Sequence, residues 1–351
     1  MSTHEEYSKL STLQKALITF LLLIGLCLNI ASMQKKATTY DEHLHFSYGT
    51  RILNGNPERV TRVDDSKMPF SALNALPLFL SEKLKKQNPS NFLIPFLSNY
   101  KTAQYVTVLF FPLLGFFIFL WSRRLYGNAA GIFSLFCYTF APNLIAHARL
   151  VTTDFYITAL TTISLYFFWK FNQNPSVKNS FLSALTLGLA QLTKYTAIYL
   201  YFIFGVIFFL KHAGQIGKIR HHYKKIIIHL FLFIFINLFV INAGFLFKNT
   251  LIPLKDYSFR SRLFQSIQTN AGLLKTVPLP FPHAFIDGLD WVKNNEETGE
   301  SFGNIYLFGK IKNKATPERN FKGYYIFAFL FKVPLAIQIL ILLSLIHFFR
   351  N

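Results

Sequence analysis

The sequence predicts an all-α integral membrane protein with about eight transmembrane helices and two large segments on the outer side of the membrane. Hydrophobic residues make up 52% of the 351 positions and charged residues only 15%, whereas about a quarter of positions are charged in soluble domains. Charge-free apolar stretches recur, each close to the length that crosses ~30 Å of hydrocarbon. Three short connections between them are basic, as cytoplasmic loops are. We treat residues 1–351 as one transmembrane domain.

The excess of 36 Lys and Arg over 16 Asp and Glu does not indicate nucleic-acid binding. The basic residues are scattered between apolar runs, whereas nucleic-acid-binding proteins gather them in one patch or stripe. Cys27 and Cys137 lie inside apolar runs, and their spacing fits neither a disulfide framework nor a metal site. We therefore expect a protein of the lipid bilayer with no nucleic-acid partner.

Eight candidate spans follow in order: residues 16–34, 102–122, 125–148, 155–169, 179–193, 195–210, 226–247 and 333–349. The first is too long for a secretory signal peptide and lacks its small-residue cleavage site, so it stays a span. The fifth and sixth separate near Lys194. A single helix over 179–210 would bury this lysine and place the basic connection 211–225 on the face opposite to 170–178. We therefore expect Lys194 near the outer surface.

This topology places residues 35–101 and 248–332 outside, together with thirteen of the sixteen acids. Loops longer than ~15 residues are uncommon unless they are functional or disordered, and neither segment has a disordered composition. The first includes a helical stretch from Asp41 to Leu53. The second alternates polar turns with aromatic runs, which is typical of helices and loops at the membrane interface.

Asp154 is the sole acid between Glu82 and Asp256. Ionisable residues at membrane depth are costly, so an acid that opens an apolar helix is a functional candidate. A plain helix cap is the alternative, because Thr152 and Thr153 precede it and an acid there favours the helix dipole. One residue can serve both purposes, and the sequence leaves both open.

Asp41 and Glu42 form the second acidic candidate. Thr39 and Glu42 have the spacing of a capping box, which offers a structural interpretation. Neighbouring residues on a helix point about 100° apart, so the two carboxylates would need different tasks. His43 and His45 could suggest a metal site with Asp41, but residues two apart face away from each other on a helix and no further ligand is near. We expect no cofactor, with a divalent metal as a minor alternative.

Cations gather at the same outer ends: Lys67, His147, Arg149 and Lys194. A single basic residue at a membrane boundary normally extends to the lipid headgroups. Four cationic groups that converge with two acidic sites on one face are less ordinary. They suggest a phosphate held at the membrane surface.

Five motifs occur in a characteristic order over residues 40–336: DEHLHFSYG, SKMPFSALNALP, ARLVTTDFYITAL, LGLAQLTKYTAIYL, and GNIYLFGKI followed by GYYIFAFLFKVPLA. Together they resemble bacterial polyprenyl-phosphate-dependent glycosyltransferases of the GT-C superfamily. Relatives in that superfamily are the protein O-mannosyltransferases and the lipid A aminoarabinose transferase. The resemblance covers nearly the whole chain.

The resemblance implies a role for each matching residue. Asp41 would be the base on the acceptor hydroxyl, and Glu42 would orient a substrate. Lys67 would contact the donor phosphate, although the chain reads Lys-Met-Pro where the family has a His-Pro element. Asp154 and Lys194 match the other positions at the active face.

The chemistry fits one carboxylate base and several cations. A phosphate leaving group is a weak base, so the reaction needs no general acid, unlike glycoside hydrolysis. Displacement by a bound acceptor would invert the anomeric centre. The expected donor is a polyprenyl-phosphate sugar, and the acceptor is a protein, lipid A or an envelope glycan. We expect a multi-pass protein of the cell inner membrane with its active face in the periplasm.

Two other functions remain open. A transporter or lipid flippase could use intramembrane acids, Lys194 and a broken helix, but transporters place such groups near the midplane and usually show repeats. A non-catalytic membrane subunit could use the outer segments to bind a partner. Family members usually continue beyond the KVPLA segment with further spans, so the resemblance also implies a shortened or split member.

Overall fold

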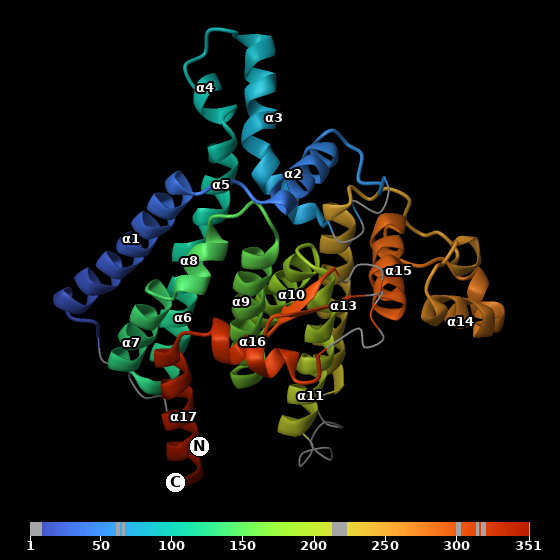
Figure 1. Ribbon diagram of the computed structural model, residues 1–351. Coiled ribbons are helices and arrows are strands. Elements are labelled where there is room, and N and C mark those ends of the chain that lie inside the picture. Colours follow the sequence, from blue (N-terminus) through green and yellow to red (C-terminus); the bar gives the residue numbers. More distant parts are fainter. Residues whose placement is uncertain are drawn as a thin grey trace.

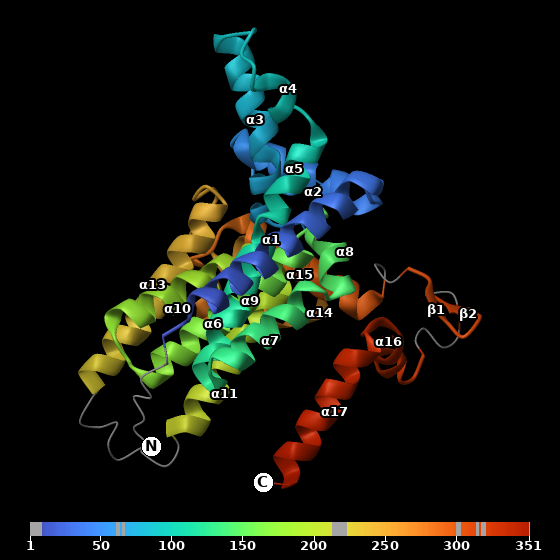
Figure 2. The same cartoon turned by 90° about the vertical axis from the view of Figure 1, so that its left-hand side faces the viewer.

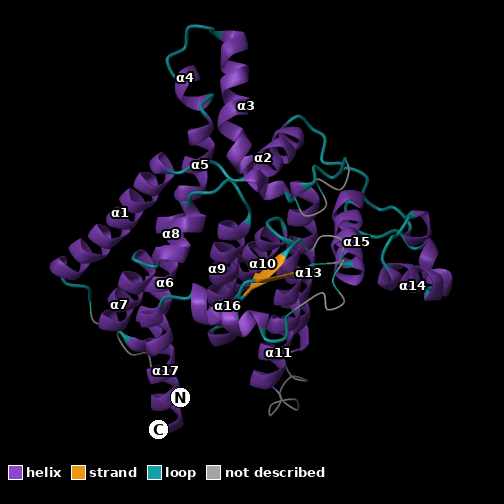
Figure 3. Cartoon of the chain, viewed as in Figure 1, coloured by secondary structure: helices purple, strands orange, loops and turns teal. Residues whose placement is uncertain are grey.

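The computed structural model describes residues 9–60, 64, 67–212, 223–299, 303–313, 316 and 321–350. The described chain is almost entirely helical, with one short β-hairpin (Figure 3). The elements are, in order, α1 (Thr12–Lys35), α2 (Tyr40–Leu53), η1 (Pro69–Ser71), α3 (Ala72–Gln87), α4 (Ile94–Leu97), α5 (Tyr100–Val108), α6 (Phe110–Tyr126), α7 (Asn128–Thr139), α8 (Pro142–Ala148), α9 (Asp154–Gln173), α10 (Val177–Gln191), η2 (Tyr195–Ile198), α11 (Tyr199–His212), α13 (Tyr223–Gly244), η4 (Leu254–Asp256), α14 (Arg262–Asn270), η5 (Gly272–Thr276), α15 (His283–Thr298), β1 (Ile305–Leu307), β2 (Lys310–Lys312), α16 (Tyr324–Lys332) and α17 (Leu335–Arg350).

Every predicted span corresponds to a helix or to a pair of helices. The span expected at 125–148 divides into α7 and α8, which meet at an angle of 62°. Pro142 opens α8, and a residue that precedes proline disfavours the helical conformation, so the chain turns at Ala141. The break expected near Lys194 is confirmed, because α10 ends at Gln191 and α11 begins at Tyr199.

Fewer helices than expected are long and apolar enough to cross a membrane. Within the described residues, three meet both criteria: Thr12–Lys35, Tyr100–Tyr126 and Ile226–Gly244. The number rises to five if each sharply bent helix pair is one span. The predicted eight exceeds what length and composition support. For example, the 15 residues of α10 cover about 22 Å, which is less than the ~30 Å hydrocarbon core.

The long helices form one bundle (Figure 1). Phe111 of α6, Leu135 of α7 and Phe155 of α9 belong to one buried apolar cluster. α10 lies against both α9 and α13, and a Cβ on Gly188 would come within 2.9 Å of Val240 Cβ. The missing side chain therefore lets α10 and α13 approach closely.

Basic residues from three connections gather at one end of the bundle. Arg124 of α6 and Lys170 of α9 both lie over the same tyrosine ring, with 5.6 Å and 5.9 Å to its centroid. Lys211 of α11 donates to a backbone oxygen near the end of α9. This is the grouping that the sequence predicts for the cytoplasmic side. Residues 213–222 of the third connection lie outside the described residues.

The first outer segment lies at the opposite end of the bundle, where α3 and α4 extend away from it (Figures 1 and 2). α2 packs directly on η1. The contact is so close that a Cβ on Gly49 would overlap the backbone oxygen of Ser71.

The last two helices of the chain, α16 and α17, meet at 111° and have no buried residues. Figure 2 shows α17 standing apart from the bundle.

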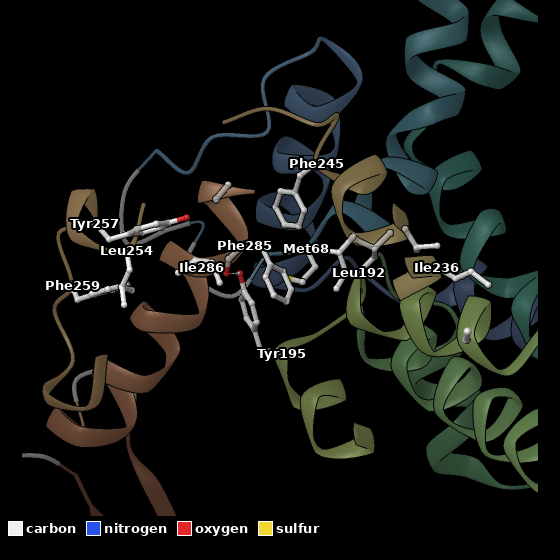
Figure 4. Packing of buried hydrophobic residues seen from close by; sticks show 14 residues of the cluster. Met68, Leu192, Tyr195, Ile236, Phe245, Leu254, Tyr257, Phe259, Phe285 and Ile286 are labelled. Carbon is white, nitrogen blue, oxygen red and sulfur yellow. Dashed lines mark hydrogen bonds between the residues drawn. The ribbon is translucent and has the colours of Figure 1, made fainter. Parts of the chain in front are cut away.

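An apolar cluster joins four segments of the chain (Figure 4). Met68 comes from the first outer segment, Leu192 and Tyr195 from the helix break, Phe245 from the residues just after α13, and Phe285 from α15. Phe70 N also donates to Leu192 O at 3.1 Å. These contacts fix the helix break against both outer segments.

Candidate active site

The start of α2 separates the two neighbouring acids, as the 100° rotation between adjacent helical residues requires. Asp41 lies in the first turn and is exposed, whereas Glu42 is completely buried. Thr39 N donates to Glu42 Oε1 at 2.7 Å, so the predicted capping box is present. The two carboxylates therefore occupy different environments.

Glu42 connects α2 to two other parts of the chain. Its Oε2 accepts from Gln104 Nε2 of α5 and from Val151 N, both at 3.0 Å. Val151 lies in the short segment that leads into α9 and Asp154. With Thr39 N and Thr39 Oγ1, the carboxyl group has four hydrogen-bond donors, as a buried polar group requires. Glu42 thus holds α2 against the segment that carries Asp154.

His45 lies one turn after Asp41 on the same face of α2. It is buried, and its Nδ1 is 3.2 Å from Ser71 Oγ. Burial, together with the positive charge of Lys67, lowers the pKa of His45 to about 3, while the Asp154 carboxylate acts in the opposite direction. His45 is therefore neutral at physiological pH. The charges of Lys67, Asp154 and Lys194 all act on it, so these three predicted residues lie within electrostatic range of His45.

Asp154 forms an ion pair with Lys194. The Lys194 Nζ atom is 2.7 Å from Asp154 Oδ1, and both side chains are about half exposed. The N-cap of α9 is Thr153, so the capping interpretation of Asp154 is wrong in its detail. As the first helical residue, Asp154 still favours the dipole of α9. The pair joins the start of α9 to the helix break.

A buried polar network anchors the first turn of α9. Tyr156 Oη is 3.0 Å from both Asn74 Oδ1 of α3 and Thr107 Oγ1 of α5. Asn74 Nδ2 also donates to Thr107 Oγ1 at 2.8 Å and to Ala103 O at 2.7 Å. Because such buried polar groups are costly to leave unpaired, the network fixes α9 relative to α3 and α5.

The helix break presents Lys194 in an extended backbone conformation, with φ −161° and ψ 143°. Gln191 Nε2 donates to Ala197 O at 2.9 Å, which satisfies one of the backbone oxygens freed at the break. The side chain of Lys194 is thereby directed at Asp154 rather than into the bundle. A helix that continued through this position would have no such exposed cation.

The remaining two predicted cations lie at the end of α8. His147 is exposed and within electrostatic range of Asp154. Arg149 is partly buried, and its Nη1 is buried without a hydrogen-bond partner among the described residues. A guanidinium with an unused donor is suited to bind a phosphate oxygen.

Two residues near this face are not among those that the sequence predicts for the site. The sequence suggests His45 only as a metal ligand, and it does not indicate Arg59. Arg59 contacts residues as distant in sequence as Tyr195 and Ala284, so no local pattern marks it. Within the described residues, no group of three or more His, Cys, Asp or Glu is arranged to hold a metal ion.

An apolar cavity of about 1060 Å³ lies between α9, α11 and α13. Phe168 of α9, Phe204 and Gly205 of α11, and Phe233 of α13 line it, and Phe281 of the second outer segment contributes as well. α9 also begins with Asp154, and α11 follows the break at Lys194 through η2. The cavity therefore shares α9 with the face that carries Asp154 and Lys194, which we call the charged face.

Residues 78–247 match the sequence model of a family described as dolichyl-phosphate-mannose-protein mannosyltransferase. The matched region includes Arg149, Asp154 and Lys194 but not Asp41 or Lys67. No curated protein matches the chain. The family match confirms the resemblance to the GT-C superfamily that the motifs predict, and with the helical bundle it supports a membrane glycosyltransferase of the GT-C type.

Proposed function

We propose that this protein transfers a sugar from a polyprenyl-phosphate donor to an acceptor hydroxyl on the periplasmic side of the cell inner membrane. The observation that carries the proposal is the pairing of a charged face with a large apolar cavity across one helix break. Asp154 and Lys194 meet at 2.7 Å on the face, and α11 continues from the break to line the cavity. A ligand with an anionic head and a long apolar tail suits this arrangement.

The cations bind the donor phosphate in this proposal. Lys67 and Lys194 both act electrostatically on His45, and Arg149 offers an unused buried donor. His147 lies within electrostatic range of Asp154. These groups would stabilise the negative charge that develops on the phosphate as the glycosidic bond breaks.

Asp41 acts as the base. Its carboxylate accepts the proton of the acceptor hydroxyl while the acceptor oxygen bonds to the anomeric carbon and the bond from that carbon to the phosphate oxygen breaks. A single displacement inverts the anomeric centre. Asp41 is exposed, so an acceptor can reach it. Glu42 has its acceptor sites occupied and acts by holding α2 against the segment before Asp154.

The cavity takes part of the polyprenyl tail. A phenylalanine at Gly205 tests this assignment, because a Cβ there meets no atom within 4 Å and the ring would enter the cavity without backbone strain. We expect Gly205→Phe to raise the KM for a full-length polyprenyl donor more than tenfold. A short-chain donor should be used as well as by the wild type. Val206→Phe, which adds the same ring outside the cavity lining, is the matched control.

Transfer itself is tested with purified protein, radiolabelled polyprenyl-phosphate sugars and membrane extract as the acceptor. Wild type should label an acceptor, and Asp41→Asn should not. A range of hexosyl and pentosyl donors identifies the sugar, and the labelled product identifies the acceptor. Transfer by Asp41→Asn at the wild-type rate removes Asp41 from the mechanism. Donor flipping without transfer points to the transporter alternative.

A further inference from the structure

The guanidinium of Arg59 reaches three separate parts of the chain. Its Nε donates to Ala284 O of α15 at 2.7 Å. Nη1 donates to the backbone oxygen of Asp64 and, at 2.9 Å, to that of Lys67. Nη2 donates to Tyr195 Oη at 2.6 Å. Arg59 therefore links both outer segments to the helix break.

These contacts occupy the donors of the side chain. An arginine has five N–H groups in a fixed planar fork, and four of them are directed at the oxygen atoms just described. The fifth faces Met68 Sδ at 3.7 Å from Nη2. A phosphate oxygen would have to displace one of these partners, so the geometry gives Arg59 an indirect part in donor binding.

The partners of Arg59 are adjacent to two of the proposed phosphate-binding cations. One is the backbone oxygen of Lys67 itself, and another is the side chain of Tyr195, which follows Lys194 in the sequence. Tyr195 Oη in turn donates to Phe285 O at 3.0 Å. Figure 4 shows Tyr195 beside Phe285 in the apolar cluster. Arg59 is thus bonded on one side to Lys67 and on the other to the neighbour of Lys194.

Gly288 of α15 is a second observation that supports close packing of Arg59 and Tyr195 against this helix. A Cβ on this residue would overlap Tyr195 Oη and Arg59 Nε. Any larger residue would push the guanidinium and the phenol away from α15. The glycine therefore lets the helix approach this pair.

We infer that Arg59, Tyr195 and Gly288 form a clamp that fixes the distance between the Lys67 and Lys194 side chains, and that Arg59 is a positioning residue for the donor phosphate. We call this set the Arg59 clamp. The inference rests on the proposed function for its effect on transfer. The clamp geometry itself does not, so the two can fail separately.

Lysine at position 59 separates charge from geometry. An ammonium keeps the positive charge but cannot bond to the widely spaced partners at once, because it lacks the planar fork. Arg59→Lys and Arg59→Gln should therefore lower kcat/KM for the donor by a similar factor. We expect about 100-fold, the effect of displacing reacting groups by roughly 1 Å. Gly288→Ala should resemble them.

The controls are Arg260→Gln and Gly303→Ala. Arg260 pairs with Asp287 at 2.8 Å, so Arg260→Gln removes a charged contact of α15 without changing a residue of the Arg59 clamp. A Cβ on Gly303 meets no atom within 4 Å. Both variants should keep transfer within threefold of wild type.

A second measurement does not depend on activity. Spin labels at Val60 and Glu296, in a chain with Cys27 and Cys137 replaced by alanine, report the distance between the first outer segment and α15. We expect the distance distribution to widen in the Arg59 and Gly288 variants and to keep its width in the controls. A wild type without transfer refutes the proposed function while this measurement still judges the clamp. Unchanged distances, or full activity in Arg59→Lys, would overturn the inference.

Discussion

Replacing Lys194 by methionine separates the structural and functional roles of its ion pair with Asp154. Methionine keeps much of the apolar stem and removes the charge. At the 2.7 Å separation of Nζ and Oδ1, the Coulomb energy is about 1.5 kcal/mol in a medium as polar as water. Both side chains are about half exposed, and exposed pairs typically contribute ~0.2–1 kcal/mol to stability once side-chain entropy is included. The fold should therefore lose less than ~1 kcal/mol.

The expected loss of activity is much larger. If Lys194 stabilises the charge of the departing phosphate, its removal should lower kcat by about 10²–10³-fold, as for loss of one oxyanion donor. Asp154→Asn leaves the ammonium in place but unanchored, so we expect a smaller decrease. Because Asp154 acts through Lys194, the double variant should transfer no more slowly than Lys194→Met alone.

The assay compares donor transfer with thermal unfolding of the same preparations in detergent. The expected Tm change in Lys194→Met is at most about 2–4 °C. Two results would refute the reasoning. One is transfer within threefold of wild type, which makes the pair a surface contact. The other is a Tm decrease large enough to account for the lost activity, which makes it a structural bridge.

Other substitutions test the different roles of Asp41 and Glu42 on α2 and the contact between the two outer segments. Asp41→Asn should abolish transfer and change the free energy of unfolding by less than ~0.5 kcal/mol. Glu42→Gln should instead lower the free energy of unfolding by about 1–3 kcal/mol for each buried donor left unpaired, as an unfolding experiment would measure. The interaction between Glu58 and His283, with Asn249 also bonded to Glu58, lowers the pKa of Glu58 and raises that of His283. The interaction therefore contributes fully to the free energy of unfolding between roughly pH 4.5 and 6.5, the unperturbed pKa values of the two groups. This contribution is lost as the pH falls through the lowered pKa of Glu58 or rises through the raised pKa of His283. The Tm difference between wild type and His283→Asn should be largest in that window and should shrink as the pH rises through the raised pKa of His283; a pH-independent difference contradicts the assignment.

Much of the helical framework could be predicted from the sequence, because charge-free apolar runs reflect the demand for internally bonded backbone in hydrocarbon. The break at Lys194 was predictable for the same reason, since a buried ammonium is costly. The number of spans was not. The runs at 179–193 and 195–210 are free of charged residues, as spans are, but the helices that they form, α10 with 15 residues and α11 with 14, are too short.

The site was predictable to a different degree for each residue. Asp154 and Lys194 stand out because few charges occur in their apolar surroundings, and the structure pairs them. The burial of Glu42 and His45 depends on contacts with α5, η1 and the segment before α9, which local sequence does not encode. Arg59 is similar, because its partners Tyr195 and Ala284 come close only when the chain is folded.

In the proposed function, the helix break lets one segment contact both ends of an amphipathic donor. Lys194 has an extended backbone, so its ammonium leaves the bundle toward Asp154. The chain then re-enters the bundle through η2 and α11, and Phe204 of α11 lines the cavity. With a rise of ~2.0 Å per residue in η2 and ~1.5 Å in α11, the backbone of Phe204 lies roughly 15 Å along the helix from that of Lys194. An unbroken helix would still place Phe204 in the cavity wall but would not direct Lys194 at Asp154. A loop in place of α11 would still expose Lys194 but would not form an apolar wall.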